Sequence, residues 1–305
     1  MEKNDFTDTD QGMTLEERIG GSGRPLLLDG GMGTQLGAAG LPMGAETCLS
    51  HPDAVGAVHR AYAAAGADLV ITHTLTLNRV AAQAAGSGVD IRAGNRAAAG
   101  IARRAAEGGQ YVLGDIGTTG KLLAPVGPLA EEDARAAYLE QAAALAEGGV
   151  DGFIVETMIS LPEALVALAA CREAAPALPV LVSMTFKMTP KGARTVMGNS
   201  VADCARALAA AGAAAVGANC GDLDPLEMAA LVPDFRQACA LPIMIQPNAG
   251  RPLLVDGRTV FAMTPVEFAA GTMRAAEAGA RLVGGCCGTT PAHIRALARL
   301  LRGGE

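Results

Sequence analysis

The stretch HPDAVGAVHRAYAAAGADLVIT at 51–72 combines the two local patterns that decide the fold. Its first part, 52–65, places apolar residues at i, i+3 and i+4, as one face of a helix does. Its last part, 68–72, is a short apolar run of the kind found in strands buried on both faces. The glycine of AAGAD at 64–68 supplies the left-handed cap between them. We interpret the stretch as one helix followed by one parallel strand.

The same unit recurs along the chain. Small-residue turns of this kind also stand at 147–151 (EGGVD), 210–214 (AAGAA) and 277–281 (EAGAR). The expected strands are 25–28, 68–72, 111–116, 152–156, 179–185, 215–218, 242–246 and 281–284. The expected helices are 52–65, 131–147, 161–174, 201–211, 225–239, 265–278 and 291–301. Such alternation is typical of a parallel sheet, and eight units in about 280 residues predict a (β/α)8, or TIM, barrel of the α/β class.

A doubly wound open sheet is the rival fold. It is disfavoured because LDGGMGTQL at 28–36, after the first expected strand, lacks the Gly-x-Gly-x-x-Gly spacing of dinucleotide-binding folds. The length of 305 residues would also allow two domains, but no Pro/Ser/Gly-rich linker or charge run divides the sequence. We expect a single barrel domain over 24–305, preceded by an acidic, flexible tail at 1–23.

Composition narrows the partners and the compartment. The formal net charge is -7 and the basic residues are scattered, which argues against nucleic acid and anionic membranes, since both need clustered Lys and Arg. The first 23 residues lack the apolar segment of a signal peptide, and no stretch reaches the roughly 18 apolar residues of a spanning helix. We therefore expect a cytoplasmic protein with neither a nucleic-acid nor a membrane partner.

The cysteines indicate metal chemistry. Their number, seven, is odd and their spacing irregular, which suits reduced thiols better than a disulfide framework. Cys220 follows the sixth expected strand, and Cys286 and Cys287 follow the eighth, so their strand ends are separated by only one strand in a closed barrel. Three thiolates suit Zn²⁺ and leave its fourth position open to a substrate. The alternative, that these are buried cysteines acting as small apolar residues, stays open on spacing alone.

Several polar residues also stand at the ends of expected strands, where barrel active sites gather. Asp29 and Glu156 each end an apolar run, and a charge there is costly unless it is paired or functional. Two carboxylates facing one mouth would bind an amine, whereas the alternative is solvent exposure or a helix cap. For His73, after the second strand, a structural hydrogen bond is favoured over catalysis. His59 is interpreted as a surface or helix residue.

Six stretches together resemble a known family: LLLDGGMGTQL at 26–36, HPDAVGAVHRAYAAAGADLV at 51–70, FIVETM at 153–158, GANCG at 217–221, QPNAG at 246–250 and GGCCGTTPAHI at 284–294. They are similar to the homocysteine S-methyltransferase family, which includes the homocysteine-binding barrel of cobalamin-dependent methionine synthase and betaine–homocysteine methyltransferase. The resemblance extends over about residues 25–300. It implies Zn²⁺ bound by Cys220, Cys286 and Cys287, and Asp29 and Glu156 holding the amino-acid end of homocysteine.

The resemblance also suggests further substrate-binding residues and shows two departures. Asn248 of PNAG lies where the family approaches the metal, and Thr72 and Asn78 are kept in ITHTLTLN at 71–78, which replaces a family pattern like ETNTFGAN. Thr118 stands where family members commonly carry proline. One face of the pocket has therefore changed.

The activity that the resemblance implies is zinc-dependent transfer of a methyl group to the thiol of homocysteine, which gives methionine. The donor is either methylcobalamin carried by a separate corrinoid protein, which we favour, or a small methyl-onium compound such as S-methylmethionine or betaine. Aromatic residues make up only 3% of the chain, which disfavours a cage for betaine. Two alternatives remain: a zinc barrel for another thiol or a methoxylated substrate in a corrinoid system, and a non-catalytic partner subunit.

Overall fold

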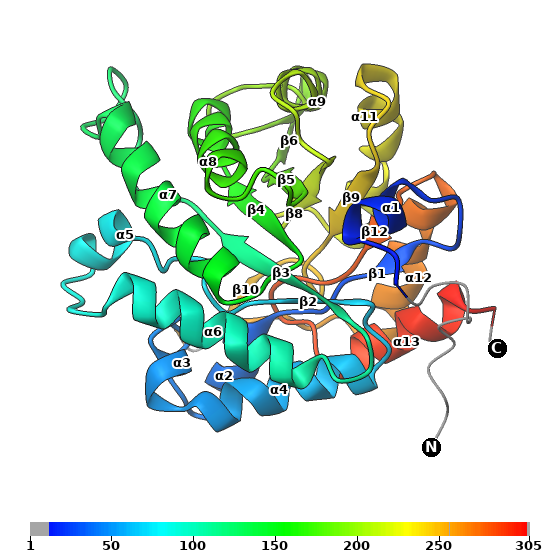
Figure 1. Cartoon of the computed structure of the whole chain (residues 1–305). Helices are drawn as coiled ribbons and strands as arrows, with labels where there is room; N and C mark the ends of the chain where they lie inside the picture. Colours follow the sequence, from blue (N-terminus) through cyan, green and yellow to red (C-terminus); the bar gives the residue numbers. More distant parts are fainter. Residues whose placement is uncertain (1–11, 256, 304–305) are drawn as a thin grey trace.

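The computed structural model describes residues 12–255 and 257–303, and its centre is a ring of eight parallel strands (Figure 1). These strands are β1 (Leu26–Leu27), β2 (Leu69–Ile71), β3 (Tyr111–Ile116), β4 (Gly152–Met158), β5 (Val180–Met184), β8 (Ala215–Asn219), β9 (Ile243–Gln246) and β12 (Leu282–Val283). Their order is β1-β12-β9-β8-β5-β4-β3-β2, and a parallel bridge between Leu28 and Leu69 joins the first strand to the last. The predicted TIM barrel is confirmed, and each expected run overlaps one strand, although β4 and β8 extend two residues and one residue beyond their expected ends.

Helices cover the outside of the ring (Figure 1). The longer ones are α4 (Pro52–Ala64), α6 (Ile91–Ala105), α7 (Glu131–Glu147), α8 (Leu161–Ala174), α9 (Val201–Ala210), α12 (Pro265–Glu277) and α13 (Pro291–Leu301). The short ones are α1 (Leu15–Gly20), α2 (Met32–Ala38), α3 (Thr47–Ser50), α5 (Arg79–Ala84), α10 (Pro225–Ala229) and α11 (Val232–Ala238). The expected helix 225–239 is thus divided in two, and the second part begins around Pro233, which cannot donate to the preceding turn.

Helix α6 is absent from the sequence expectations. Its glycines lower the helical propensity, and Gly94 packs closely against Leu77, whose Cδ2 would lie 2.9 Å from a Cβ at that position. Antiparallel hairpins β6 (Lys187–Thr189) with β7 (Gly192–Arg194), and β10 (Leu253–Val255) with β11 (Arg258–Val260), follow β5 and β9. Among the described residues no helix is long and apolar enough to cross a membrane.

Helix α1 lies within the segment 1–23 that we expected to be a flexible tail. Thr14 and Glu17 form a capping box at its start, and Leu15 and Ile19 are each 2% exposed and pack with the leucines inside the barrel. Residues 15–20 are therefore a packed helix, because they cover apolar side chains at the N-terminal end of the ring. Residues 1–11 lie outside the described residues.

Side chains two residues apart on a strand face the same side, so alternate residues of each strand line the barrel interior. Leu113, Ile154 and Met244 belong to one buried cluster inside the ring. Two positions further along the same strands stand Asp115, Glu156 and Gln246. The interior therefore changes from apolar to polar at the C-terminal ends of the strands.

Candidate metal centre and substrate cavity

Three cysteines meet at the C-terminal mouth. Cys220 directly follows β8, and Cys286 and Cys287 follow β12; their sulfur atoms lie within 4.8 Å of one another, and those of Cys220 and Cys287 are 4.0 Å apart. Thiolates around one tetrahedral Zn²⁺ at about 2.3 Å would be roughly 3.8 Å apart. The donor set therefore fits a zinc ion, and it is the one such group of three found within residues 12–255 and 257–303.

The backbone around the cysteines is shaped for this cluster. Cys220 has φ +58°, a left-handed conformation that costs a residue with a Cβ about 1–3 kcal/mol unless its surroundings hold it. Asn248 supplies part of that hold: its Nδ2 donates to the Gly221 carbonyl (2.8 Å), and its Oδ1 accepts from the Cys287 N–H (3.0 Å). Asn248 thus ties the two cysteine loops together.

The thiols of the cluster share charge unequally. Hydrogen bonds from the Cys286 and Cys287 thiols lower the pKa of Cys220 to about 3. The same hydrogen bonds raise the pKa of both donors. The lowered pKa of Cys220 favours its thiolate form, and a thiolate at this position favours a bound cation.

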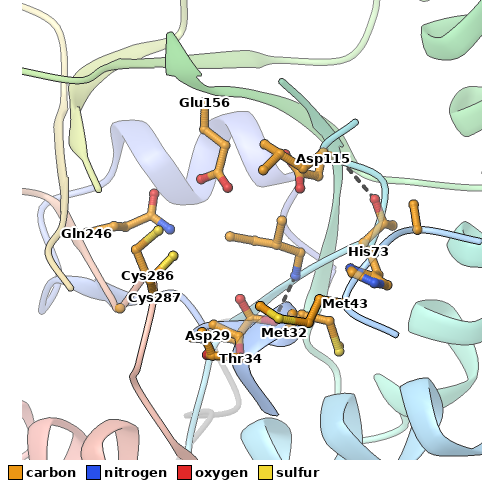
Figure 2. A pocket seen from close by; sticks show the side chains of 18 of the residues that line it. Asp29, Met32, Thr34, Met43, His73, Asp115, Glu156, Gln246, Cys286 and Cys287 are labelled. Carbon is orange, nitrogen blue, oxygen red and sulfur yellow. Dashed lines mark hydrogen bonds between the residues drawn. The ribbon is translucent and has the colours of Figure 1, made fainter. Parts of the chain in front are cut away.

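A cavity of about 250 Å³ opens beside the cysteines. Figure 2 shows the carboxyl groups of Asp29, Asp115 and Glu156 pointing into it, with Cys286 and Cys287 on one side and His73 on the other. The His73 ring is held by a hydrogen bond in which its Nε2–H donates to the Gly44 carbonyl (2.9 Å), as the sequence suggested. Lysine and arginine are absent from the described residues that line the cavity.

Asp29 is 2% exposed and only half satisfied. Its Oδ2 accepts from the Ile71 N–H (3.0 Å), while its Oδ1 has no partner among the described residues. Burial raises the pKa of Asp29 well above its usual range, and the nearby Glu156 raises it further. His59 Nδ1 is 4.0 Å from Asp29 Oδ2, but burial lowers the pKa of His59 to about 3. The two therefore form no ion pair at neutral pH, and His59 is a fully buried helix residue rather than a surface one.

Glu156 is positioned by a network centred on Asn219. The Asn219 Oδ1 accepts from the Thr157 N–H (2.8 Å) and the Ser183 hydroxyl (2.5 Å), and its Nδ2 donates to Thr157 Oγ1 (2.8 Å) and, at 3.4 Å, to Glu156. Thr157 has φ +60°. Burial, followed by the charge of Cys220, raises the pKa of Glu156 to about 8. The hydrogen bonds with Asn219 thus hold Thr157 in its left-handed conformation, at the point where the pairing of β4 with β5 shifts register.

Two expected substrate-binding residues have other roles in the structure. Asn78 is the N-cap of α5, with its Oδ1 accepting from the Ala81 N–H (2.9 Å), and it does not line the cavity. Thr72 does line it, but its hydroxyl is shared between Thr74 Oγ1 (2.7 Å) and the Asp115 N–H (2.9 Å). The structure brings Thr72 to the cavity and leaves Asn78 outside it, because the chain turns into a helix at that point.

Asp115 was missed by the sequence reasoning. It stands inside the run YVLGDI at 111–116, whereas the predicted site residues stand at the end of an expected run or after it. The signal was present in the strand period: Asp115 is two residues after Leu113 and so faces the barrel interior. A charged residue at an inward position is costly unless it serves a ligand or a partner.

Comparisons with known proteins agree with this geometry. The family model described as homocysteine S-methyltransferase matches residues 26–301. The chain is 34% identical to methionine synthase of Mycobacterium leprae (strain TN) and 33% identical to that of Mycobacterium tuberculosis (strain ATCC 25618 / H37Rv). Each alignment is 313 positions long and covers 95% of this chain and 25% of the relative. The chain thus spans about a quarter of the length of these relatives. The crystal structure of the homocysteine methyltransferase MmuM from Escherichia coli, in its metallated form, is 26% identical with a TM-score of 0.75 and covers 91% of this chain and 96% of that one.

Proposed function

Since the chain belongs to the homocysteine S-methyltransferase family, we propose that it transfers a methyl group to the thiol of homocysteine, giving methionine, with Zn²⁺ held by Cys220, Cys286 and Cys287. The observation that carries this proposal is the meeting of three thiols within 4.8 Å beside a cavity lined by buried carboxyl groups. One end of that arrangement suits a metal-bound thiol, and the other suits an amino group.

Each end of the acceptor has residues to hold it. A bound zinc ion supplies deprotonation of a coordinated thiol at neutral pH, which makes the sulfur a nucleophile. Asp29 and Glu156 bind the ammonium group, and its positive charge favours their ionised forms against the burial that raises their pKa. Asn219 orients Glu156, and Asn248 joins the two cysteine loops. The substrate sulfur is thereby fixed where a methyl group can approach in line.

For the donor, we propose methylcobalamin carried by a separate corrinoid protein. Large apolar side chains are exposed on loops that follow the barrel strands, on the rim of the mouth; they are Met43, Val126, Met188, Val196 and Leu254. Leu254 belongs to the β10–β11 hairpin, on which Leu253, Val255 and Val260 are exposed as well. An exposed apolar surface of this kind favours a protein partner over a small solute. The acidic cavity supports the other candidate, a small methyl-onium compound, because buried carboxylates stabilise a cation.

The donor can be decided by two parallel assays on the same zinc-loaded protein. Methionine formation is measured with a methylcobalamin-loaded corrinoid protein and, separately, with S-methylmethionine. A protein donor predicts turnover only in the first assay, lowered by Leu254→Ser. Turnover with S-methylmethionine that Leu254→Ser leaves unchanged would favour the small donor.

The metal and the acceptor are tested together by zinc analysis and X-ray absorption at the zinc edge. Wild type is compared with Cys286→Ser and with Cys204→Ser, a control in which the exchanged cysteine is buried in α9 away from the site. We expect near-stoichiometric zinc in wild type and control, loss in Cys286→Ser, and one additional sulfur ligand when homocysteine is added. Zinc without a new sulfur would indicate another acceptor, and no zinc in reduced wild-type protein would refute the proposal.

Two further measurements, binding of a corrinoid protein and a panel of substrates at fixed zinc content, separate the rival functions. A non-catalytic partner subunit would bind a corrinoid protein without binding homocysteine. A barrel for another thiol or a methoxylated substrate would retain zinc but respond to a different member of a substrate panel. The altered segment 71–78, which contributes Thr72, His73 and Thr76 to the cavity wall, is the part of the site that favours this second possibility.

A further inference from the structure

The cavity contains a third carboxyl group that neither the metal cluster nor the two expected ammonium ligands explain. Asp115 lies on β3, is 5% exposed and lines the cavity together with Asp29 and Glu156. Its backbone is fully engaged, with the N–H donating to Thr72 and the carbonyl accepting from Thr74. Its side-chain Oδ1, by contrast, has no partner among the described residues.

The unpaired buried atoms around the cavity are of one kind. They are Asp29 Oδ1, Asp115 Oδ1 and Gln246 Oε1, all of them acceptors on residues that line the cavity. Because an unpaired buried acceptor is costly, a ligand that brings hydrogen-bond donors to these three oxygens would be stabilised in the cavity. Lysine and arginine are absent from the described lining, so the ligand also brings the positive charge.

Resting on the function proposed above, we propose that Asp115 determines acceptor specificity: it accepts a hydrogen bond from the primary ammonium group of the thiol, as the third carboxylate around that group. A primary ammonium has three N–H donors, and Asp29, Asp115 and Glu156 offer one carboxylate for each. A quaternary ammonium or a sulfonium has no such donors and would leave Asp29 Oδ1 and Asp115 Oδ1 without a partner.

The arrangement also limits the length of the acceptor. The Nδ2 of Asn219 lies 3.4 Å from Glu156 Oε2 and 3.9 Å from Cys286 Sγ, so one amide spans from the carboxyl cluster to the thiol cluster. A ligand that reaches both has its amine and sulfur separated by a few carbons. The substrate class is therefore a short amino thiol, and thiols without an amine are discriminated against.

Calorimetric titration of the zinc-reconstituted protein tests this inference with two thiols, L-homocysteine and 4-mercaptobutyrate, which has the same skeleton without the amine. The variants are Asp115→Asn and Asp115→Ser, and Asp234→Asn on the exposed side of α11 is the matched control. We expect Asp115→Asn to raise the Kd of homocysteine by about tenfold to a hundredfold and to leave that of 4-mercaptobutyrate unchanged. Circular dichroism verifies that each variant is folded.

Each of the other outcomes would overturn a specific part of this inference. An equal weakening of both thiols in the two Asp115 variants would mean a structural role for Asp115, and no weakening of either would mean that it does not touch the acceptor. Equal affinity of the wild type for the two thiols would overturn ammonium recognition while thiol binding stands. A wild type that binds neither thiol would overturn the proposed function and this inference with it.

Discussion

Replacing Asn219 by alanine should affect both the stability and the metal site. Asn219 is fully buried, and alanine removes the acceptor of the Thr157 N–H and of the Ser183 hydroxyl. A buried donor left without its acceptor costs about 1–3 kcal/mol, and the hydroxyl can rotate to another acceptor. We expect a loss of about 2–4 kcal/mol in the free energy of unfolding, or roughly 3–6 °C in Tm for a chain of this length.

The site effect follows from the other contacts of the same side chain. The Asn219 Nδ2 approaches Cys286 Sγ and Glu156 Oε2, and loss of such an outer contact typically weakens metal binding by about 10- to 100-fold. Asn95→Ala is the matched control, since Asn95 lies in α6, away from the cysteines, and is equally buried. Its side chain donates to the carbonyls of Leu77 (2.9 Å) and Ile91 (2.8 Å).

Both variants are measured by calorimetry of the metal-free protein and by zinc competition against a chelating dye. Similar losses of stability are expected, with weaker zinc binding in Asn219→Ala alone. Equal zinc affinities in the two variants would refute the reasoning that Asn219 orients the site, and an unchanged Tm would refute the hydrogen-bond argument itself.

Three further predictions concern the barrel, pH and metal. Gly217→Ala should lower the free energy of unfolding in urea by about 3 kcal/mol or more, since its Cβ would lie 1.9 Å from the Met244 carbonyl oxygen. The control Gly88→Ala has open space around it and should change this free energy by under about 0.5 kcal/mol. Comparable values for the two variants would contradict this packing. Burial lowers the pKa of His59 from 6.5 to about 3, so between pH 7.5 and 5 the unfolded chain takes up a proton that the folded chain does not. The free energy of unfolding of the wild type should therefore fall by about 2 kcal/mol over this range relative to His59→Phe. Parallel pH profiles of the two proteins would show that His59 titrates normally. Zinc at a hundredfold its Kd should raise the free energy of unfolding by about 2.7 kcal/mol, and Cys287→Ser should abolish the gain, so a gain retained in that variant would argue against the cysteine site.

The barrel was predictable because its signals are local. Each strand is a short apolar run, and each following helix has its own period and cap, as 51–72 illustrates. Helix α6 was not predicted because Gly94 and Gly100 weaken its local pattern. The close packing of Gly94 against Leu77 depends on the tertiary structure. Helix α1 was not predicted because its acidic, glycine-flanked sequence is typical of a flexible tail. Only the tertiary structure shows that Leu15 and Ile19 pack against the leucines inside the barrel.

The sequence by itself determined the strands, the three cysteines that meet at the mouth, and the carboxyl groups at the ends of β1 and β4, because each depends on neighbours along the chain or on a strongly patterned motif. Only the tertiary structure decided that Asp115 joins those carboxyl groups, that Asn78 caps a helix outside the cavity, and that His59 is fully buried. The physical reason is barrel closure, which brings together strands and helices that are far apart in the sequence. Whether a polar side chain is buried, and whether it finds a hydrogen-bond partner, depends on those distant residues and cannot be predicted from a local pattern.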